Sequence, residues 1–164
     1  MPSDWIRNKA EHEIKEQAKQ TAFEEKQKRD AELIRALGPK LVEELRKVIH
    51  ADIVAWNENF TDRQINGTSY IPNGFSVDKV GFPRGSADIK FNPVTLRIEI
   101  GLTRSVLTDF GESYHMDGYV HVRANPDGRG VHMEERFRNS YLEPAEFSRM
   151  ILESIAEPQS NHMF

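Results

Sequence analysis

The feature that most constrains the fold is a long alternation of apolar and polar residues in the second half of the chain. From Val94 to Leu102, and again from Tyr114 to Val122, nearly every second residue is apolar, and polar residues or glycine lie between them. Successive side chains of a β-strand point to opposite faces, so this period of two predicts strands that are buried on one face only. Such strands are typical of an antiparallel sheet with one packed face and one solvated face.

Three further segments complete a predicted antiparallel meander of about five strands. The same alternation occurs over residues 87–91 and 131–137, and a short strand is expected within 75–80. Glu135 falls on the apolar face of its segment, so we expect it to lie at the end of the sheet. Turn signals separate the strands at Asn92-Pro93, at residues 108–113 and at Asn-Pro-Asp-Gly, residues 125–128.

Helices are predicted at both ends of the chain. Residues 4–37 contain no Gly or Pro and are rich in Ala, Glu, Lys, Gln and Arg, which favours a helix. Gly38-Pro39 predicts a break and the start of a second helix, residues 39–57, which has a broad apolar face. A final helix is expected from Pro144 to before Pro158. Because helices and strands are segregated, the sequence predicts an α+β fold with two N-terminal helices and a C-terminal helix packed on the sheet.

The first predicted helix has little apolar surface to bury. Ile6, Ala10, Ile14 and Ala18 form a thin stripe that fades through residues 24–30. We therefore expect a charged helical arm at residues 1–37 and a single domain at residues 38–164. The arm is either solvated or docked through its stripe on another chain, and the sequence alone leaves both interpretations open.

Composition excludes several classes of site and partner. The chain has no cysteine, so it holds no disulfide, no thiol nucleophile and no Cys-based metal site. No apolar run approaches the roughly 18 residues of a membrane span. Residues 1–50 carry 11 Lys/Arg and 10 Asp/Glu, and residues 51–164 carry 11 and 16. These balances of +1 and −5 make a nucleic-acid partner an unfavourable hypothesis, since phosphate binding needs concentrated positive charge. We expect a cytoplasmic protein with no membrane partner.

The polar face of the predicted sheet is the candidate binding surface. It combines aromatic, charged and histidine side chains, which are typical of surfaces that bind proteins or polar ligands. A four-residue turn at 125–128 would place Val122 opposite Val131, and His121 opposite His132. The candidate residues are Arg97, Glu99, His115, Asp117, Tyr119, His121, His132, Glu134 and Arg136.

The two facing histidines are the one pair from which a metal site could be built. A zinc site requires three or four ligands; Glu134 and Tyr119 would lie one pair further along than His121 and His132, and of these two only Glu134 is a usual ligand. We therefore predict no metal and no cofactor. The competing interpretation of the whole face is an uncovered sheet surface with mixed charges, which antiparallel sheets tolerate.

No linear motif in the chain specifies a reaction. The leading hypothesis is a non-enzymatic interaction module that uses the arm and the polar sheet face to bind a protein partner or a second copy of the chain. The alternative is a small-molecule-binding protein or an enzyme. Its site would lie on the His121/His132 face or in a pocket between the sheet and the second helix, near Trp56 and Phe60. The sequence does not identify a ligand, a partner or a process.

Overall fold

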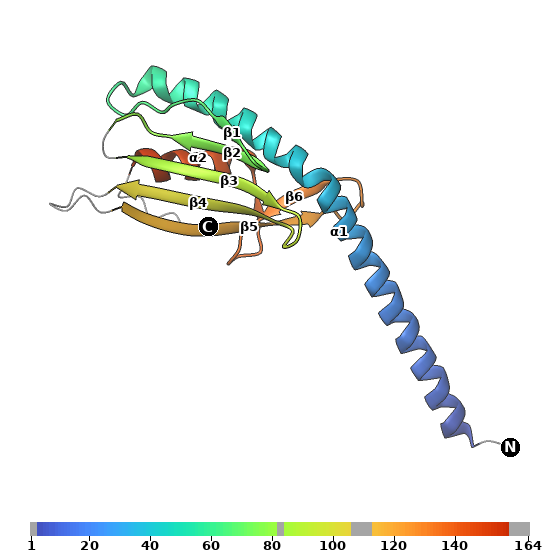
Figure 1. Ribbon diagram of the computed structural model, residues 1–164. Coiled ribbons are helices and arrows are strands. Elements are labelled where there is room, and N and C mark those ends of the chain that lie inside the picture. Colours follow the sequence, from blue (N-terminus) through green and yellow to red (C-terminus); the bar gives the residue numbers. More distant parts are fainter. Residues whose placement is uncertain (1–2, 82–83, 106–112, 158–164) are drawn as a thin grey trace.

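The computed structural model describes residues 3–81, 84–105 and 113–157. One long helix, seven strands and one short helix follow each other along this part of the chain, which confirms the α+β class (Figure 1). The helices are α1 (Asp4–Asn59) and α2 (Pro144–Ala156). The strands are β1 (Ser69–Ile71), β2 (Gly74–Asp78), β3 (Gly85–Asn92), β4 (Arg97–Ser105), β5 (Ser113–Ala124), β6 (Val131–Glu134) and β7 (Tyr141–Leu142).

The strands form a single antiparallel meander in which each strand pairs with the next one along the chain. The described sheet has seven strands where the sequence predicted about five. The two additional strands are the outermost ones, β1 and β7, which are three and two residues long. An alternation cannot be recognised in segments this short, so hydrophobic periodicity could not predict them.

The predicted break at Gly38-Pro39 is wrong, because α1 runs without interruption for 56 residues. Gly38 does not end the helix but lies buried where α1 crosses the sheet. A Cβ at this position would lie 2.4 Å from ring atoms of Phe91, which is far too close. The close approach of helix and sheet therefore explains the glycine at position 38. The structure has one N-terminal helix where the sequence predicted two.

Pro39 lies inside α1 with its ring exposed to solvent. Proline has no N–H for the carbonyl of Arg35 and crowds it, which costs about 3 kcal/mol and bends a helix. Figure 1 shows α1 changing direction near the point where it leaves the sheet. The helix continues because Leu41, Val42 and Leu45 are buried directly afterwards, and each burial contributes roughly 1.5–3 kcal/mol.

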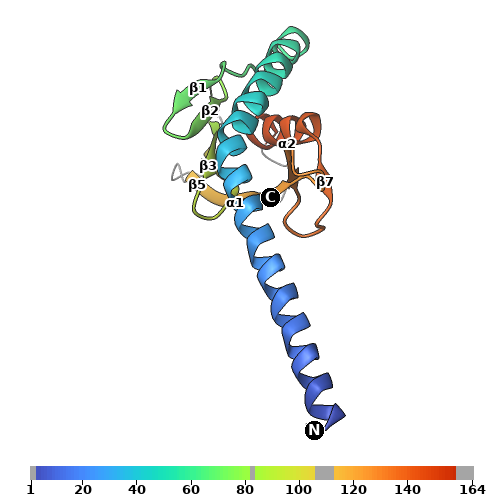
Figure 2. The ribbon, with the colours of Figure 1, turned by 90° about the vertical axis from the view of Figure 1, so that its right-hand side faces the viewer.

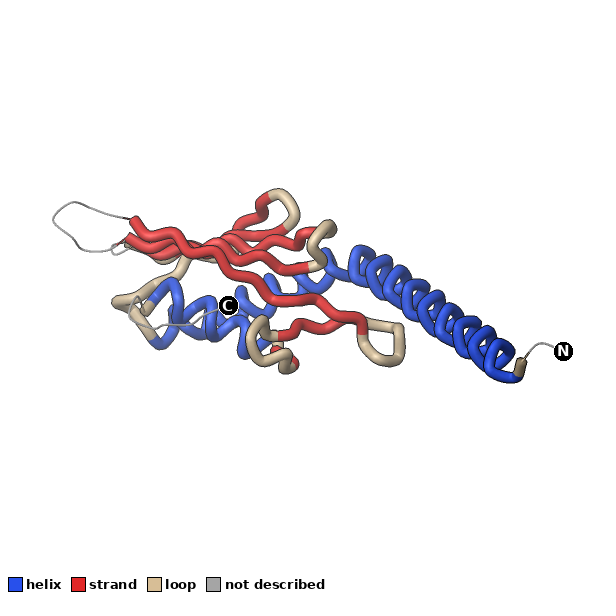
Figure 3. Tube along the Cα trace, turned by 90° about the horizontal axis from the view of Figure 1, so that it is seen from below, coloured by secondary structure: helices blue, strands red, loops and turns tan. Residues whose placement is uncertain are grey.

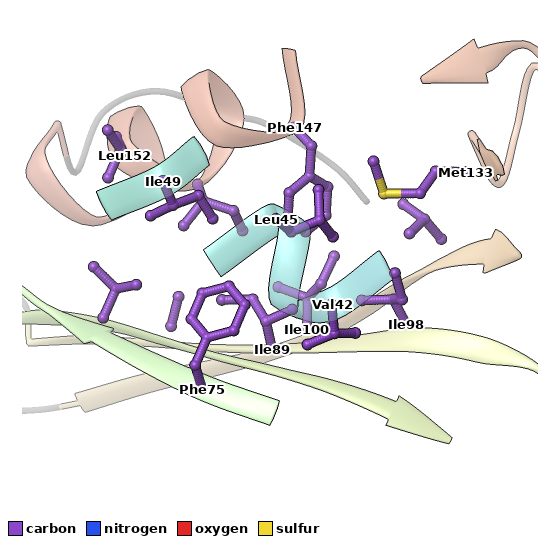
Figure 4. Packing of buried hydrophobic residues seen from close by; sticks show 14 of the residues in the cluster. Val42, Leu45, Ile49, Phe75, Ile89, Ile98, Ile100, Met133, Phe147 and Leu152 are labelled. Carbon is purple, nitrogen blue, oxygen red and sulfur yellow. The ribbon is translucent and has the colours of Figure 1, made fainter. Parts of the chain in front are cut away.

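The hydrophobic core lies between one face of the sheet and the two helices. α1 and α2 pack side by side against this face, as Figure 2 shows. Side chains from α1, α2 and the strands meet in one cluster, shown in Figure 4. Ile89, Ile100, Val120, Phe147 and Ile151, all predicted to be apolar core positions, are buried. Tyr114 and Met116 at the start of β5 were predicted on the same face but are 54% and 46% exposed, so the period-two prediction is confirmed only for the middle of the sheet.

The turn between β3 and β4 differs from its sequence-based prediction. The strand expected from Val94 begins at Arg97, because residues 93–96 form the turn between β3 and β4. The side-chain oxygen of Asn92 accepts hydrogen bonds from the N–H groups of Val94, at 2.9 Å, and Thr95, at 3.1 Å. These bonds stabilise the turn and take the following residues out of the strand. Of the predicted turn at 108–113, residues 108–112 lie outside the described part of the chain.

The register between β5 and β6 also differs from the prediction. Val122 pairs with Met133, and His121 pairs with Glu134. The connecting loop covers residues 125–130 and is closed by a 2.8 Å hydrogen bond from the Asn125 N–H to the Gly130 carbonyl. The register is shifted by two residues, so every side chain keeps its predicted face but changes its partner. β6 ends at Glu134, which agrees with the expectation that Glu135 lies at the end of the sheet.

Candidate functional site

The face of the sheet opposite the core is not covered by either helix. α1 and α2 both pack on the apolar face, and in Figure 3 the strands are seen in front of the helices. The polar face is built from three central strands, whose pairings place its residues in rows across the sheet. One row is Asp88, Gly101 and Asp117, and the next is Lys90, Glu99 and Tyr119.

Gly101 leaves a gap in the first of these rows. The aspartates lie on the neighbouring strands on either side of it, one on β3 and one on β5. A Cβ built on Gly101 would lie 3.8 Å from the Cβ of Asp88 and 3.8 Å from Oδ1 of Asp117, both ordinary contact distances. The missing side chain thus leaves a notch over the backbone, bounded by the imidazole of His115, whose Cε1 would be nearest at 3.5 Å, by Oδ1 of Asp117 and by the Cβ of Asp88.

Tyr119, in the second row, has guanidinium groups packed on its ring. The Arg97 guanidinium carbon lies 4.0 Å from the ring centroid, and that of Arg136 lies 4.6 Å from it. Arg97 comes from β4, whereas Arg136 comes from the turn after β6. Cation–π contacts of this kind fix the position of an arginine without using its hydrogen-bond donors.

The notch and the arginine pair belong to one surface hollow of about 570 Å³. This volume is within the range of small-molecule sites, roughly 300–1,000 Å³. The hollow also includes Asp88 and Lys90 of β3 and Gly101 of β4. Gly101 was not recognised from the sequence as part of a site. A glycine inside a strand could have signalled it, since such positions often mark close approach of a ligand. Six of the nine candidate residues line the hollow: Arg97, Glu99, His115, Asp117, Tyr119 and Arg136.

The other three candidates, His121, His132 and Glu134, lie on the same face beyond the hollow. The predicted facing of His121 and His132 is wrong, since His121 is opposite Glu134 and His132 is opposite Arg123. Nδ1 of His132 shares a 2.7 Å hydrogen bond with the side-chain oxygen of Asn125, and its Nε2 lies 3.5 Å from Glu134. Both ring nitrogens of His132 therefore already have protein partners. Within the described ranges, no group of three or more His, Cys, Asp or Glu could hold a metal ion.

His121 lies among positive charges. Burial of its imidazole lowers the pKa of His121 below its ordinary value of about 6.5, and the charges of Arg123 and Arg97 lower it further. Its ring packs edge-on against Tyr119, with the centroids 5.3 Å apart. At neutral pH His121 is therefore a neutral imidazole beside the arginine pair.

His115 connects two hydrogen-bonding groups at the acidic end of the hollow. Its Nε2 lies 2.8 Å from Oδ1 of Asp117, and its Nδ1 lies 3.2 Å from the hydroxyl of Thr103. These two bonds fix the orientation of the imidazole on an otherwise exposed surface. Asp117 pairs in register with Gly101 and contacts His115.

A second hollow, of about 390 Å³, lies near Trp56 and Phe60. The sequence predicted a pocket here between the sheet and the second helix. In the structure the wall of the hollow opposite α1 is α2, through Arg149 and Leu152, and not the sheet. The Trp56 indole N–H donates to the Arg63 carbonyl at 2.8 Å, and the rings of Trp56 and Phe60 are 4.5 Å apart. The pocket is therefore a shallow apolar groove between two helices.

The first half of α1 extends away from the other described elements (Figure 1). Every residue from Ser3 to Arg29 is exposed, and the first buried residue is Ile34. Trp5 and Ile14 are 66% and 65% exposed, which is unusual for side chains of this size. Across the described segments, no helix combines the length and hydrophobicity needed to cross a membrane.

Searches of protein-family models, of curated proteins and of solved structures found no match to this chain.

Proposed function

We propose that this protein is a non-enzymatic binding module that holds a polar partner on the uncovered face of its sheet. The hollow over Gly101 is the observation that carries this proposal. It gathers charged groups of both signs and one aromatic ring on a rigid sheet. A surface of this composition offers many hydrogen bonds at fixed positions, which suits selective binding of a polar group.

The exposed half of α1, residues 4–29, would then bring two copies of the module together. Its seven basic and six acidic residues nearly balance, so a second copy is not repelled. At about 1.5 Å per residue this arm extends roughly 39 Å. Trp5 and Phe23 offer apolar surface on one side of it and Ile14 on the opposite side. Burying that surface in another chain would stabilise a helix segment that is exposed in the described part of its own chain.

Native mass spectrometry of the tag-free full chain tests the assembly part of the proposal. We expect more than one copy of the chain, and a monomer once residues 1–29 are removed. The matched control replaces Lys9 and Lys19 by Gln, which alters exposed charge but keeps Trp5, Ile14 and Phe23. A full chain that is monomeric at micromolar concentration would contradict self-association through the arm. An unfolded truncated chain would show that the arm belongs to the core.

A small-molecule site in the α1–α2 groove is the second candidate. Its apolar lining, with Trp56 and Leu152, favours a small ligand with an aromatic or aliphatic part. Ala55→Trp would fill the groove from its exposed wall without disturbing the core. A ligand that remains bound to the wild-type protein and is lost from this variant would support the groove. Loss on His121→Ala or His132→Ala would instead place that ligand on the histidine face.

A further inference from the structure

The hollow over Gly101 has two ends of opposite charge. One end is the Gly101 notch, with Asp88 and Asp117 on the neighbouring strands, and the other is the pair of guanidinium groups on Tyr119. Lys90 and Glu99 lie in the row between them. A ligand that fills the hollow therefore meets negative charge at one end and positive charge at the other.

The basic end has two guanidinium groups and no acidic partner among the described residues. The carboxylates nearest in register bind elsewhere: Glu134 lies beside Arg123 and His132, and Glu99 accepts a 2.7 Å hydrogen bond from Asn92. Nε of Arg97 is buried and has no hydrogen-bond partner within the described segments. Two guanidiniums held on one ring repel each other, and an anion between them would relieve this repulsion. Carboxylates and phosphates also match the planar donor pattern of arginine.

The acidic end fits a cation of a particular kind. Metal ions generally need three or more ligands, and no such group exists in the described part of the chain. Oδ1 of Asp117 already contacts His115, whereas the carboxylate of Asp88 makes no hydrogen bond or ion pair with another described residue. An ammonium group donates three hydrogen bonds and needs no coordination sphere, so it suits a notch with an aspartate on the strand at each side.

We propose that the hollow binds a small zwitterion, with its ammonium group in the Gly101 notch and its acidic group at Arg97 and Arg136. The inference rests on the proposed binding role of the sheet face. Along a strand, Gly101 is two residues from the Glu99–Tyr119 row and four from Arg97, or about 7 Å and 13 Å. An extended tripeptide spans about 10 Å between its termini. A short peptide with free termini therefore matches the spacing of the two ends.

Titration of the full-length protein with triglycine, followed by amide NMR shifts, tests the inference. The matched probes are N-acetyltriglycine, which lacks the ammonium group, and triglycine amide, which lacks the carboxylate. We expect triglycine to shift the amides of Gly101 and Tyr119, and each blocked probe to bind about tenfold more weakly or worse. Equal binding of all three probes, or binding that needs only the carboxylate, would overturn the zwitterion assignment.

The Gly101→Val variant separates occupation of the hollow from general surface binding. Its Cβ would make only ordinary contacts, the closest at 3.5 Å to His115, and a β-branched residue suits a strand. We therefore expect a folded protein that has lost triglycine binding. The control is Gly67→Val, whose Cβ would approach only the His50 ring, at 3.8 Å, far along the chain from the hollow. Retained binding in Gly101→Val would refute the site.

Failure of this inference is distinguishable from failure of the proposed function. If triglycine does not bind but the full chain still assembles through residues 1–29, the zwitterion is the wrong ligand class and the interaction module stands. If Gly101→Val instead changes the assembly of the full chain, the hollow receives a protein segment, and the small-ligand proposal is overturned.

Discussion

The two halves of α1 share one backbone helix but have opposite environments. Residues 4–29 are exposed on every side, whereas the second half buries Ile34, Leu41, Leu45, Ile49 and Ile53 against the sheet and α2. The first half is helical because its residues favour helices locally, and the second because its apolar side is packed. The comparison shows that one continuous helix can be stabilised by two different causes along its length.

The largest expected effect is the difference in stability between truncating one apolar side chain in the packed half of α1 and truncating one in the exposed half. Leu45 is fully buried and Ile14 is 65% exposed. Leu45→Ala should lower the free energy of unfolding by about 2–5 kcal/mol, because it removes buried surface and leaves a cavity. At protein concentrations low enough for the chain to be monomeric, Ile14→Ala should change it by no more than about 0.5 kcal/mol, because Ile14 is exposed in the single chain.

Chemical denaturation measures both values. The chain has two tryptophans, Trp5 in the exposed half and Trp56 in the packed half. A Trp5→Phe background would make Trp56 the single fluorescent reporter of the core. A large effect of Ile14→Ala in this background would mean that the first half packs against something in solution.

Gly38 marks the point where α1 meets the sheet, and adding one methyl group there should be costly. A Cβ would lie 2.4 Å from the Phe91 ring. We expect Gly38→Ala to destabilise the protein by about 1–3 kcal/mol through overpacking, although Ala favours a helix by about 1 kcal/mol over Gly. Adding Phe91→Leu should recover part of the loss. If Gly38→Ala alone raises the melting temperature, the close approach does not restrain the helix.

Two serines on α2 offer a matched test of how the packed half is held. Ser148 and Ser154 are both fully buried, and Ser148 donates a hydrogen bond, at 2.5 Å, to the carboxylate of Asp52 on α1. The hydroxyl of Ser154 has no hydrogen-bond partner among the residues that the structure describes. Ser148→Ala should cost about 1–3 kcal/mol, because it leaves a partly buried carboxylate without its donor. Ser154→Ala should be neutral or slightly stabilising in the same urea titration.

The smallest expected effect is a pH dependence from His121 on the sheet. Burial lowers its pKa in the folded state, so below about pH 6.5 the unfolded chain binds more protons than the folded one. Stability should therefore fall as the pH decreases through 6.5 and level off below the folded pKa. His121→Gln should remove this part of the pH profile. An unchanged profile in the variant would assign the dependence to another group.

Local pattern was enough to predict the apolar and polar faces of the sheet and the final helix. The positions of Ile98, Ile100, Val120 and Val122 follow from a period of two, and α2 follows from its Pro144 start and apolar stripe. These features depend on residues that are close together in the sequence, so they can be predicted from the sequence alone.

Pairing across strands could not be predicted in the same way. A shift of two residues keeps every side chain on its face, so hydrophobic patterning cannot distinguish His121 opposite His132 from His121 opposite Glu134. The hydrogen bond between Asn125 and Gly130 in the loop decides between them. The sequence therefore predicted the polar face of the sheet, but His121 and His132, which it predicted to lie opposite each other, do not do so in the structure.

The sequence by itself determined the α+β class, the long helical start and which residues could face solvent on the sheet, because these depend on local periodicity and propensity. Only the tertiary structure decided that α1 continues through Gly38 and Pro39, since the packing that outweighs the proline comes from residues distant in the chain, such as Phe91. It also decided where the polar face is hollowed. Gly101 leaves a notch only because strand pairing places Asp88 and Asp117 on its two sides.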